Sequence, residues 1–302
     1  MKQSMRKFTR KKISAFQICM FTLLLLQALS TLLLLYWGVI TSLKSQNDFR
    51  RNNLFGFPRG MFWDWEWGNI VTIIENFHVN RIRDGVPKTI YIGEMLTYSL
   101  LYSIGNAFIT TIVPLTVAYA CAKFDYKFSK FIYFIVIVTR ILPLVGTAPA
   151  AITILKFFNI YDTFIGNYVQ HFNFLSLYFL VFFAGFKGLP NDYAEAAYLD
   201  GASEWSVYLN IMVPLMKNMF FTVMLLMFIS FWNDYGTPLI YMPTHPTLAL
   251  GVYVLRDTTQ NNLSSVPMKM AGCTILVFPI LILFLFLHKR IMGNISLGGI
   301  KG

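Results

Sequence analysis

The chain has 302 residues and a mass of 34.8 kDa, a length typical of two soluble domains, but its composition excludes a soluble protein. Hydrophobic residues make up 56% of the chain and charged residues only 13%, whereas charged residues are about a quarter of ordinary soluble domains. This low charge density also disfavours intrinsic disorder and nucleic-acid binding, so we expect an all-α membrane protein. The positions of the charged residues behind its net charge of +11 then indicate its topology.

Six apolar segments predict membrane-spanning helices, because a bilayer core of about 30 Å takes roughly 20 helical residues to cross. The first segment is uncharged and longer than the roughly 7–15 apolar residues of a cleavable signal peptide, the alternative interpretation. Pro114 predicts a kink in the second, Arg140, Pro143 and Pro149 interrupt the third, and the fourth extends back to Thr163 without a charge. The six segments are residues 16–40, 98–122, 131–155, 172–186, 219–241 and 271–287.

The distribution of Lys and Arg predicts which side of the membrane holds the termini. Fourteen of the 25 lie on the side of the termini, and their density there is about twice that of the opposite side, so both termini are expected in the cytoplasm. Seven basic residues lie in the external loop 41–97, but long loops are translocated largely regardless of charge. The basic segment 1–15 and the tail 288–302 are then cytoplasmic.

The external loop 41–97 contains three tryptophans at alternate positions, Trp63, Trp65 and Trp67. Three interpretations stay open: an aromatic belt at the lipid headgroups, a patch for a partner protein, or a platform on which a sugar stacks. The polar segment 75–97 carries no pattern that assigns it.

The longest cytoplasmic segment, 188–214, predicts two short helices. Pro190 and Asn191 favour the start of a helix, Gly201 is a natural stop, and Ser203 can cap a second helix. Pattern alone leaves open a surface or re-entrant helix that merely connects two spans. The small side chains of the first helix would also let another protein approach its backbone closely.

The same segment resembles the EAA motif of ABC importer permeases. The matching positions, with one departure at Val213 where the family usually has Leu, are Glu195, Ala196, Ala197, Gly201, Ile211 and Pro214. The likeness is to carbohydrate-importer permeases of the maltose-transporter type, in particular the shorter, six-span partner. It extends to Ser42–Lys44, to the segments LYSIGNAFITTIVPLTVAYACAKF, YLDGASEW and FWNDYGTPLI, and to the Lys301-Gly302 ending, and it thins in residues 60–97.

This resemblance implies a type I ABC importer permease fold, with residues 98–287 as the transmembrane domain and the EAA loop as a coupling helix that docks on an ATPase subunit. Glu195 and Asp200 would supply acceptors to that partner. The implied partners are a second permease subunit, two ATPase subunits and an extracytoplasmic solute-binding protein, toward which the loop 242–269 would reach. The C-terminal tail 298–302 would lie near the ATPase interface. The implied substrate is a carbohydrate, with a di- or oligosaccharide expected first and glycerol-phosphate compounds or polyols as lesser options.

The sequence offers no catalytic chemistry. It contains no G-x-x-x-x-G-K-[ST] loop and no H-E-x-x-H motif, so we expect no enzyme activity and no cofactor, with ATP bound by the partner subunits. The four histidines are scattered and are expected to be solvated. Three cysteines, an odd number in apolar runs, predict neither disulfides nor a metal cluster.

Polar residues inside the predicted spans are candidates for the translocation pathway, because charge is costly in a bilayer. They are Arg140, Asn233 and Asp234. Asn233 and Asp234 match a Trp-Asn-acidic signature of the family. A helix-packing network or a helix end is the alternative for these two, and a structural pairing within the heterodimer is the alternative for Arg140. An Arg140–Asp234 pair stays open.

Two other classes of protein remain to be weighed. A self-sufficient secondary transporter would need ion-coupling residues and usually shows internal inverted repeats, yet Asp234 is nearly alone among buried acids and no repeat is visible. A membrane-bound enzyme is disfavoured by the missing catalytic constellation.

Overall fold

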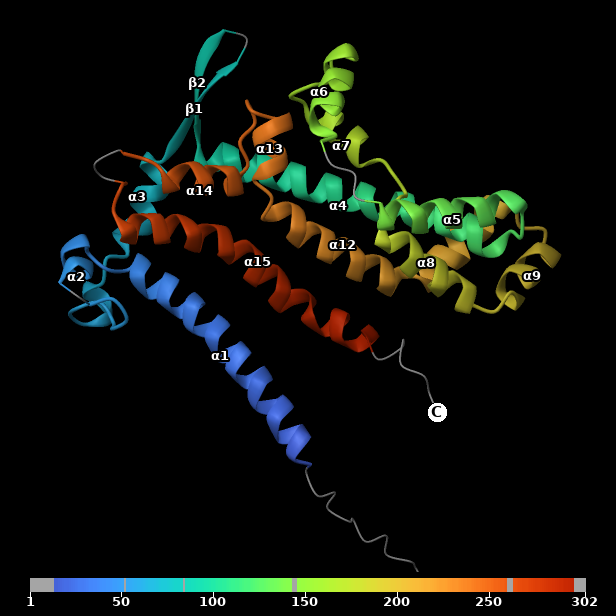
Figure 1. Ribbon diagram of the computed structural model, residues 1–302, viewed down its shortest axis with the longest axis horizontal. Helices are drawn as coiled ribbons and strands as arrows, with labels where there is room; N and C mark the ends of the chain where they lie inside the picture. Colours follow the sequence, from blue (N-terminus) through green and yellow to red (C-terminus); the bar gives the residue numbers. More distant parts are fainter. Residues whose placement is uncertain (1–13, 52, 84, 143–145, 260–262, 296–302) are drawn as a thin grey trace, which may run out of the picture.

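The computed structural model describes residues 14–51, 53–83, 85–142, 146–259 and 263–295, which form a helical protein with one β-hairpin (Figure 1). The predicted basic N-terminus, Pro143 and the Lys301-Gly302 ending lie outside these residues. The first helix, α1 (Ala15–Ser42), begins at Ser14, whose hydroxyl accepts a hydrogen bond from the Phe16 amide at 3.3 Å. The helix is apolar all round and most of its side chains are exposed, as in a helix whose solvent is lipid.

A small folded unit packs at the C-terminal end of α1. It consists of α2 (Gln46–Arg50), a 3₁₀ turn η1 (Phe62–Asp64) and α3 (Gly68–Asn76). The buried Asn69 amide donates to the carbonyls of Ser42 at 2.8 Å and Lys44 at 2.9 Å. Lys44 is itself buried and donates to the Asn53 carbonyl at 2.7 Å, and burial lowers its pKa. The segment Ser42–Lys44 is therefore a structural junction between α1 and the loop.

The unassigned segment 75–97 contains a β-hairpin that stands clear of the helices (Figure 1). Strands β1 (His78–Arg83) and β2 (Val86–Tyr91) are antiparallel, with His78 opposite Tyr91 and Arg83 opposite Val86. The tight turn includes Gly85 at φ +80°, a conformation that glycine adopts without strain. The hairpin leads directly into the longest helix, α4 (Ile92–Lys123), which continues through Pro114.

The predicted span 131–155 is two helices. α5 (Lys127–Ile141) ends one residue after Arg140, and α6 (Ala148–Phe157) begins with Pro149 in its first turn. Pro149 lacks an amide hydrogen and therefore suits a helix start but not a helix interior. Gly146, at φ +80°, lies between them. The predicted interruption of this segment is therefore a complete break between two helices.

The predicted spans 172–186 and 219–241 are also shorter or broken. α7 (Phe164–His171) is followed by an irregular segment and then by α8 (Leu177–Gly188). α12 (Lys217–Trp232) ends before Asp234, and α13 (Gly236–Tyr241) follows. Asp234 therefore lies in a helix break and not inside a continuous span.

The cytoplasmic segment of the prediction folds into α9 (Asp192–Leu199), α10 (Glu204–Val207), a π-helical turn η2 (Tyr208–Met212) and α11 (Val213–Leu215). The unit from Glu204 to Leu215 meets α12 at an angle of 72°. The chain closes with α14 (Leu248–Arg256) and α15 (Val266–Ile295), which continues through Pro279.

Helix α4 lies at the centre of the helices, with α8 and α12 packed against it. One core cluster surrounds Tyr102 and Trp232 and includes the base of the hairpin, α14 and α15. A second surrounds Phe179, Phe182 and Phe186 of α8 and reaches Ala197 in α9. A single helix therefore connects both clusters and, through them, both ends of the molecule.

Within the described residues, α1 and α4 are long and apolar enough to cross a membrane, and α12 with the bent unit before it makes a third. The apolar helices α6 and α8, and the part of α15 from Val266 to Ile282, are shorter. The six-span topology stays a prediction.

Candidate functional site

The EAA segment of the sequence forms a protruding helix, α9, at one end of the molecule (Figure 1). Asn191 occupies the N-cap position, but its side chain does not cap the helix. Its Oδ1 instead accepts a hydrogen bond from Lys123 Nζ at 2.8 Å, and the same ammonium donates to the Leu189 carbonyl at 2.7 Å. The end of α4 is thereby tied to the chain that enters α9.

Gly201 ends α9 as the sequence predicts. Its φ is +79°, in the left-handed region that favours glycine. The amides of Gly201 and Ala202 donate to the carbonyls of Tyr198 and Ala197, both at 3.0 Å. The Ser203 hydroxyl then accepts from the Ser206 amide at 3.3 Å and begins α10, which confirms the predicted cap.

One face of α9 packs inward and the other is open. Ala197 is 9% exposed within the second core cluster, whereas Leu199 is 89% exposed and Trp205, just beyond the turn, is 69% exposed. Glu195 and Ala196 are also exposed. Exposed apolar side chains rimmed by polar ones mark interaction surfaces. The four acids between residues 191 and 205, with no Lys or Arg, make this surface acidic.

Behind this surface, an aromatic cluster connects the segment to α4 and α8. The Tyr208 and Tyr119 rings lie 4.8 Å apart between centroids, and Tyr119 contacts Phe186 at 5.3 Å. The hydroxyls of Tyr208 and Thr116 are hydrogen bonded at 2.7 Å. Of the remaining predicted residues, Ile211 is partly buried against this cluster, and Asp200 and Pro214 are exposed.

Asp234, a predicted pathway residue, is held by three donors. Tyr102 of α4 donates its hydroxyl at 2.8 Å, and the amides of Gly236 and Thr237 donate at 2.9 and 3.1 Å. The carboxylate thus closes the turn before α13 and anchors it to α4. Asn233 ends α12 and donates to the Ile229 carbonyl at 2.9 Å. These bonds match the packing-network alternative for the pair.

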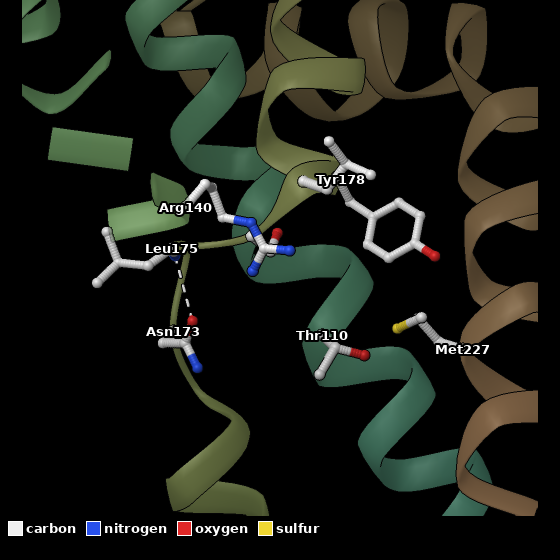
Figure 2. Close-up of a pocket in the computed structure, with 8 residues that line it drawn as sticks. Thr110, Arg140, Asn173, Leu175, Tyr178 and Met227 are labelled. Atoms are coloured by element: carbon white, nitrogen blue, oxygen red, sulfur yellow. Dashed lines mark hydrogen bonds between the residues drawn. The ribbon is translucent and has the colours of Figure 1, made fainter. Parts of the chain in front are cut away.

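Arg140 lies in the last turn of α5 and lines a pocket of about 320 Å³ between α4, α5, α8 and α12 (Figure 2). No ion pair joins it to Asp234 within the described ranges. The break between α7 and α8 brings polar residues to the same pocket, and no local pattern in the sequence predicts this. The other lining residues are Thr110, Asn173, Leu175, Ser176, Leu177, Tyr178 and Met227.

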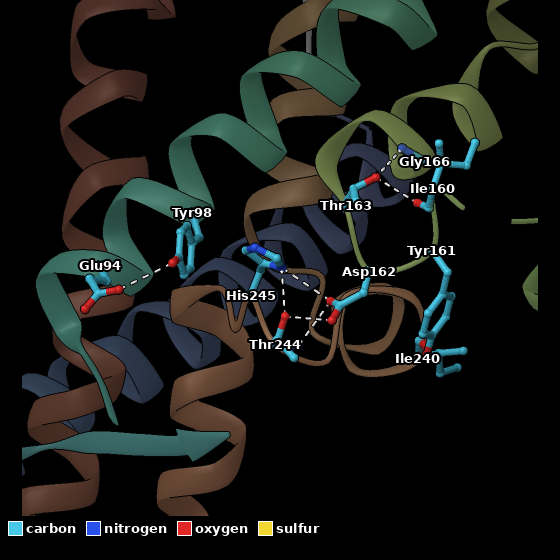
Figure 3. A network of polar contacts seen from close by, with 10 residues as sticks. All are labelled: Glu94, Tyr98, Ile160, Tyr161, Asp162, Thr163, Gly166, Ile240, Thr244 and His245. Carbon is cyan, nitrogen blue, oxygen red and sulfur yellow. Dashed lines mark hydrogen bonds and ion pairs between the residues drawn. The ribbon is translucent and has the colours of Figure 1, made fainter. Parts of the chain in front are cut away.

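A second polar network joins the loop before α7 to the loop after α13 (Figure 3). Asp162, at φ +62°, accepts the Thr244 hydroxyl at 2.6 Å and contacts His245 Nδ1 at 3.3 Å. Burial raises the pKa of Asp162, but the hydrogen bonds from His245 and Thr244 outweigh it and leave the pKa below its ordinary value. His245 is 8% exposed and packs against Tyr98 and Phe164. The expectation of a solvated histidine was therefore wrong at this position.

The tryptophans of the predicted external loop do not form one flat row. Trp65 stacks on Phe57 and Trp67 with ring centroids 5.9 and 6.4 Å apart, whereas Trp63 is 74% exposed. Two of the three are therefore part of the small folded unit at the end of α1. In the part of the chain that the structure describes, no group of three or more His, Cys, Asp or Glu side chains is placed to hold a metal ion.

Comparison with known proteins places these features in a family. Residues 111–295, more than half of the chain, match the model of the binding-protein-dependent transport system inner membrane component family. The arabinooligosaccharides transport system permease protein AraQ of Bacillus subtilis is 27% identical over 68% of this chain and 72% of its own length. The trehalose transport system permease protein SugB of Mycobacterium tuberculosis is 25% identical over 74% and 87%.

A solved structure agrees in fold. A chain in the crystal structure of a bacterial ABC transporter involved in the import of the acidic polysaccharide alginate has a TM-score of 0.75 with this one. The similarity covers 94% of this chain and 99% of that chain at 18% sequence identity, so it concerns the fold alone.

Proposed function

This chain belongs to the family of binding-protein-dependent transport system inner membrane components, and we propose that it is one permease subunit of an ATP-driven importer of di- or oligosaccharides. A second permease subunit completes the pore, two ATPase subunits supply the energy, and an extracytoplasmic binding protein delivers the sugar. The chain crosses the cell membrane six times, with both termini in the cytoplasm. Hydrolysis of ATP takes place on the partner subunits.

The observation that carries this proposal is the exposed, acidic face of α9. A partner that covers it would bury Leu199 and Trp205, which are 89% and 69% exposed, and burying a large apolar side chain contributes roughly 1.5–3 kcal/mol. Basic or amide groups of the partner would pair with Glu195 and Asp200. Ala196 on the same face leaves room for close approach to the helix backbone.

The contacts behind this face would transmit a movement of α9 to the membrane helices. Lys123 and the cluster of Tyr119 and Tyr208 connect α4 to the segments on either side of α9, and α4 holds the Asp234 turn through Tyr102. A rigid displacement of α9 by closing ATPase subunits would therefore move α4, α8 and α12 together. Such a movement between two packed arrangements gives alternating access, provided that ATP-bound and ATP-free partners contact α9 differently.

The sugar class rests on the relatives. Proteins named for the transport of arabinooligosaccharides, trehalose and diacetylchitobiose share 22–27% identity with this chain. All are named as permease proteins of transport or uptake systems. A small oligosaccharide is the substrate class that these names have in common.

Reconstitution in proteoliposomes tests the proposal. We expect uptake of a labelled oligosaccharide only when the companion permease, the ATPase subunits, the binding protein and ATP are all present. Uptake driven by an ion gradient with the purified chain alone would refute the proposal in favour of a secondary transporter.

A further inference from the structure

The Arg140 guanidinium is the one intramembrane candidate that the fold does not explain. The Asp234 carboxylate accepts hydrogen bonds from three donors. No hydrogen bond or ion pair joins the Arg140 guanidinium to a described residue, and the described ranges omit 143–145. A charged group within a span is costly and therefore faces a partner or a polar cavity. Arg140 lines the pocket between α4, α5, α8 and α12 (Figure 2).

The rest of this pocket supplies donors and no negative charge. None of its eight described lining residues is Asp or Glu. Asn173 uses its Oδ1 to accept the Leu175 amide at 3.2 Å, which leaves its NH₂ group available. Ser176 accepts the Phe179 amide at 3.3 Å and keeps its own hydroxyl hydrogen free to donate. The pocket is thus complementary to an acceptor-rich, anionic group.

Helix α8 reinforces this polarity, because it begins at the pocket. The first amides of a helix have no intrahelical acceptor and carry partial positive charge. Leu177 and Tyr178, the first two residues of α8, both line the pocket. Together with the fixed charge of Arg140, they favour an anion, since charge-assisted hydrogen bonds are roughly twice as strong as neutral ones.

The pocket also has the size and walls of a sugar subsite. Its volume of about 320 Å³ lies at the lower end of the roughly 300–1,000 Å³ of small-molecule pockets, which suits one sugar ring of a longer chain. Tyr178 and Met227 supply apolar surface for the C–H face of a ring.

We propose that the Arg140 pocket binds the carboxylate of a uronic acid unit in the transported oligosaccharide, which makes the importer selective for acidic sugars. This inference rests on the proposed function. Arg140 would bind the carboxylate through a bidentate hydrogen-bonded ion pair, and Asn173 and Ser176 would donate hydrogen bonds to neighbouring oxygens.

The test is a binding comparison on the complex of both permeases and the ATPase subunits in phosphatidylcholine nanodiscs. The probes are galacturonic acid and galactose, which differ in having a carboxylate or a CH₂OH group. We expect galacturonic acid to bind at least tenfold more tightly. Arg140→Gln should remove this preference, Arg140→Lys should retain part of it, and Lys130→Gln, which removes a charge from an exposed cytoplasmic pair, should leave it intact.

Several outcomes would overturn the inference. Equal binding of both sugars by the unaltered complex would do so without any variant, and so would a preference that survives Arg140→Gln. If Arg140 affects only the binding of added phosphatidylglycerol, its occupant is a lipid headgroup. If Arg140→Gln disrupts assembly of the two permeases without any sugar preference in the unaltered complex, Arg140 pairs with the companion subunit. ATP-driven uptake of a neutral oligosaccharide, measured separately, shows whether the proposed function stands when this inference fails.

Discussion

Gly201 is the residue whose replacement tests the shape of the proposed coupling segment, residues 191–214, most sharply. A Cβ added at Gly201 would meet no atom within 4 Å, so a side chain causes no clash there. The remaining cost is conformational, because φ is +79° and the left-handed region costs a non-glycine residue roughly 1–2 kcal/mol. That cost shifts the balance between the native turn and alternatives about 5- to 30-fold.

The matched pair is Gly201→Ala against Gly201→Asn, since asparagine tolerates the left-handed region. We expect Gly201→Ala to lower ATP-driven uptake several-fold and to weaken co-purification of the ATPase subunits, with unchanged amounts of protein in the membrane. Gly201→Asn should remain close to the unaltered protein in both assays. Equal behaviour of the two variants would show that the left-handed turn does not position α9.

Three further predictions concern other contacts. Glu195→Lys should abolish uptake while the protein stays in the membrane, whereas Glu75→Lys in α3 should not; retained coupling in Glu195→Lys would contradict the docking assignment. Tyr102→Phe should lower the free energy of unfolding by about 1.5–3 kcal/mol, because it removes a hydrogen bond to the Asp234 carboxylate; a smaller loss would mean that the turn is held by the amides of Gly236 and Thr237 alone. The folded-state pKa of Asp162 is depressed, so its contribution to stability is complete above the unfolded pKa of about 3.9 and is lost as pH falls through the lower folded value; unfolding measured against pH should lose this component in Asp162→Asn.

Local signals in the sequence located the turn between α9 and α10. Gly201 and Ser203 act through their own backbone and nearest amides, so their roles can be predicted without knowledge of the fold. Asn191 stands at the predicted helix start, but the role of its side chain could not be predicted in the same way, because it accepts a hydrogen bond from Lys123, a residue 68 positions away.

The helix breaks were harder to predict, because proline is tolerated inside membrane helices. α4 continues through Pro114 and α15 through Pro279, whereas α6 begins with Pro149 in its first turn. Neighbouring contacts and not the residue type decide between these outcomes. The sequence therefore located the apolar segments and the interruption near Pro149, but not the breaks before α8 and α13.

The Arg140 pocket and the buried His245 depend on tertiary structure. Arg140 meets Asn173 and Ser176 only because the chain is irregular between α7 and α8. His245 packs against Tyr98 and Phe164 and contacts Asp162, 83 residues earlier, so its burial depends on segments far apart in the chain. No local pattern in the sequence encodes either meeting.

Site-specific photocrosslinking tests the central claim, the docking of α9 on an ATPase subunit, most directly. A photoreactive residue at Leu199, 89% exposed on α9, is compared with one at Trp63, 74% exposed in the predicted external loop. In membranes that contain the whole transporter, Leu199 should crosslink to the ATPase subunit, with a yield that changes on addition of ATP, and Trp63 should not. A crosslink to the ATPase from position 63, or none from position 199, would contradict the account.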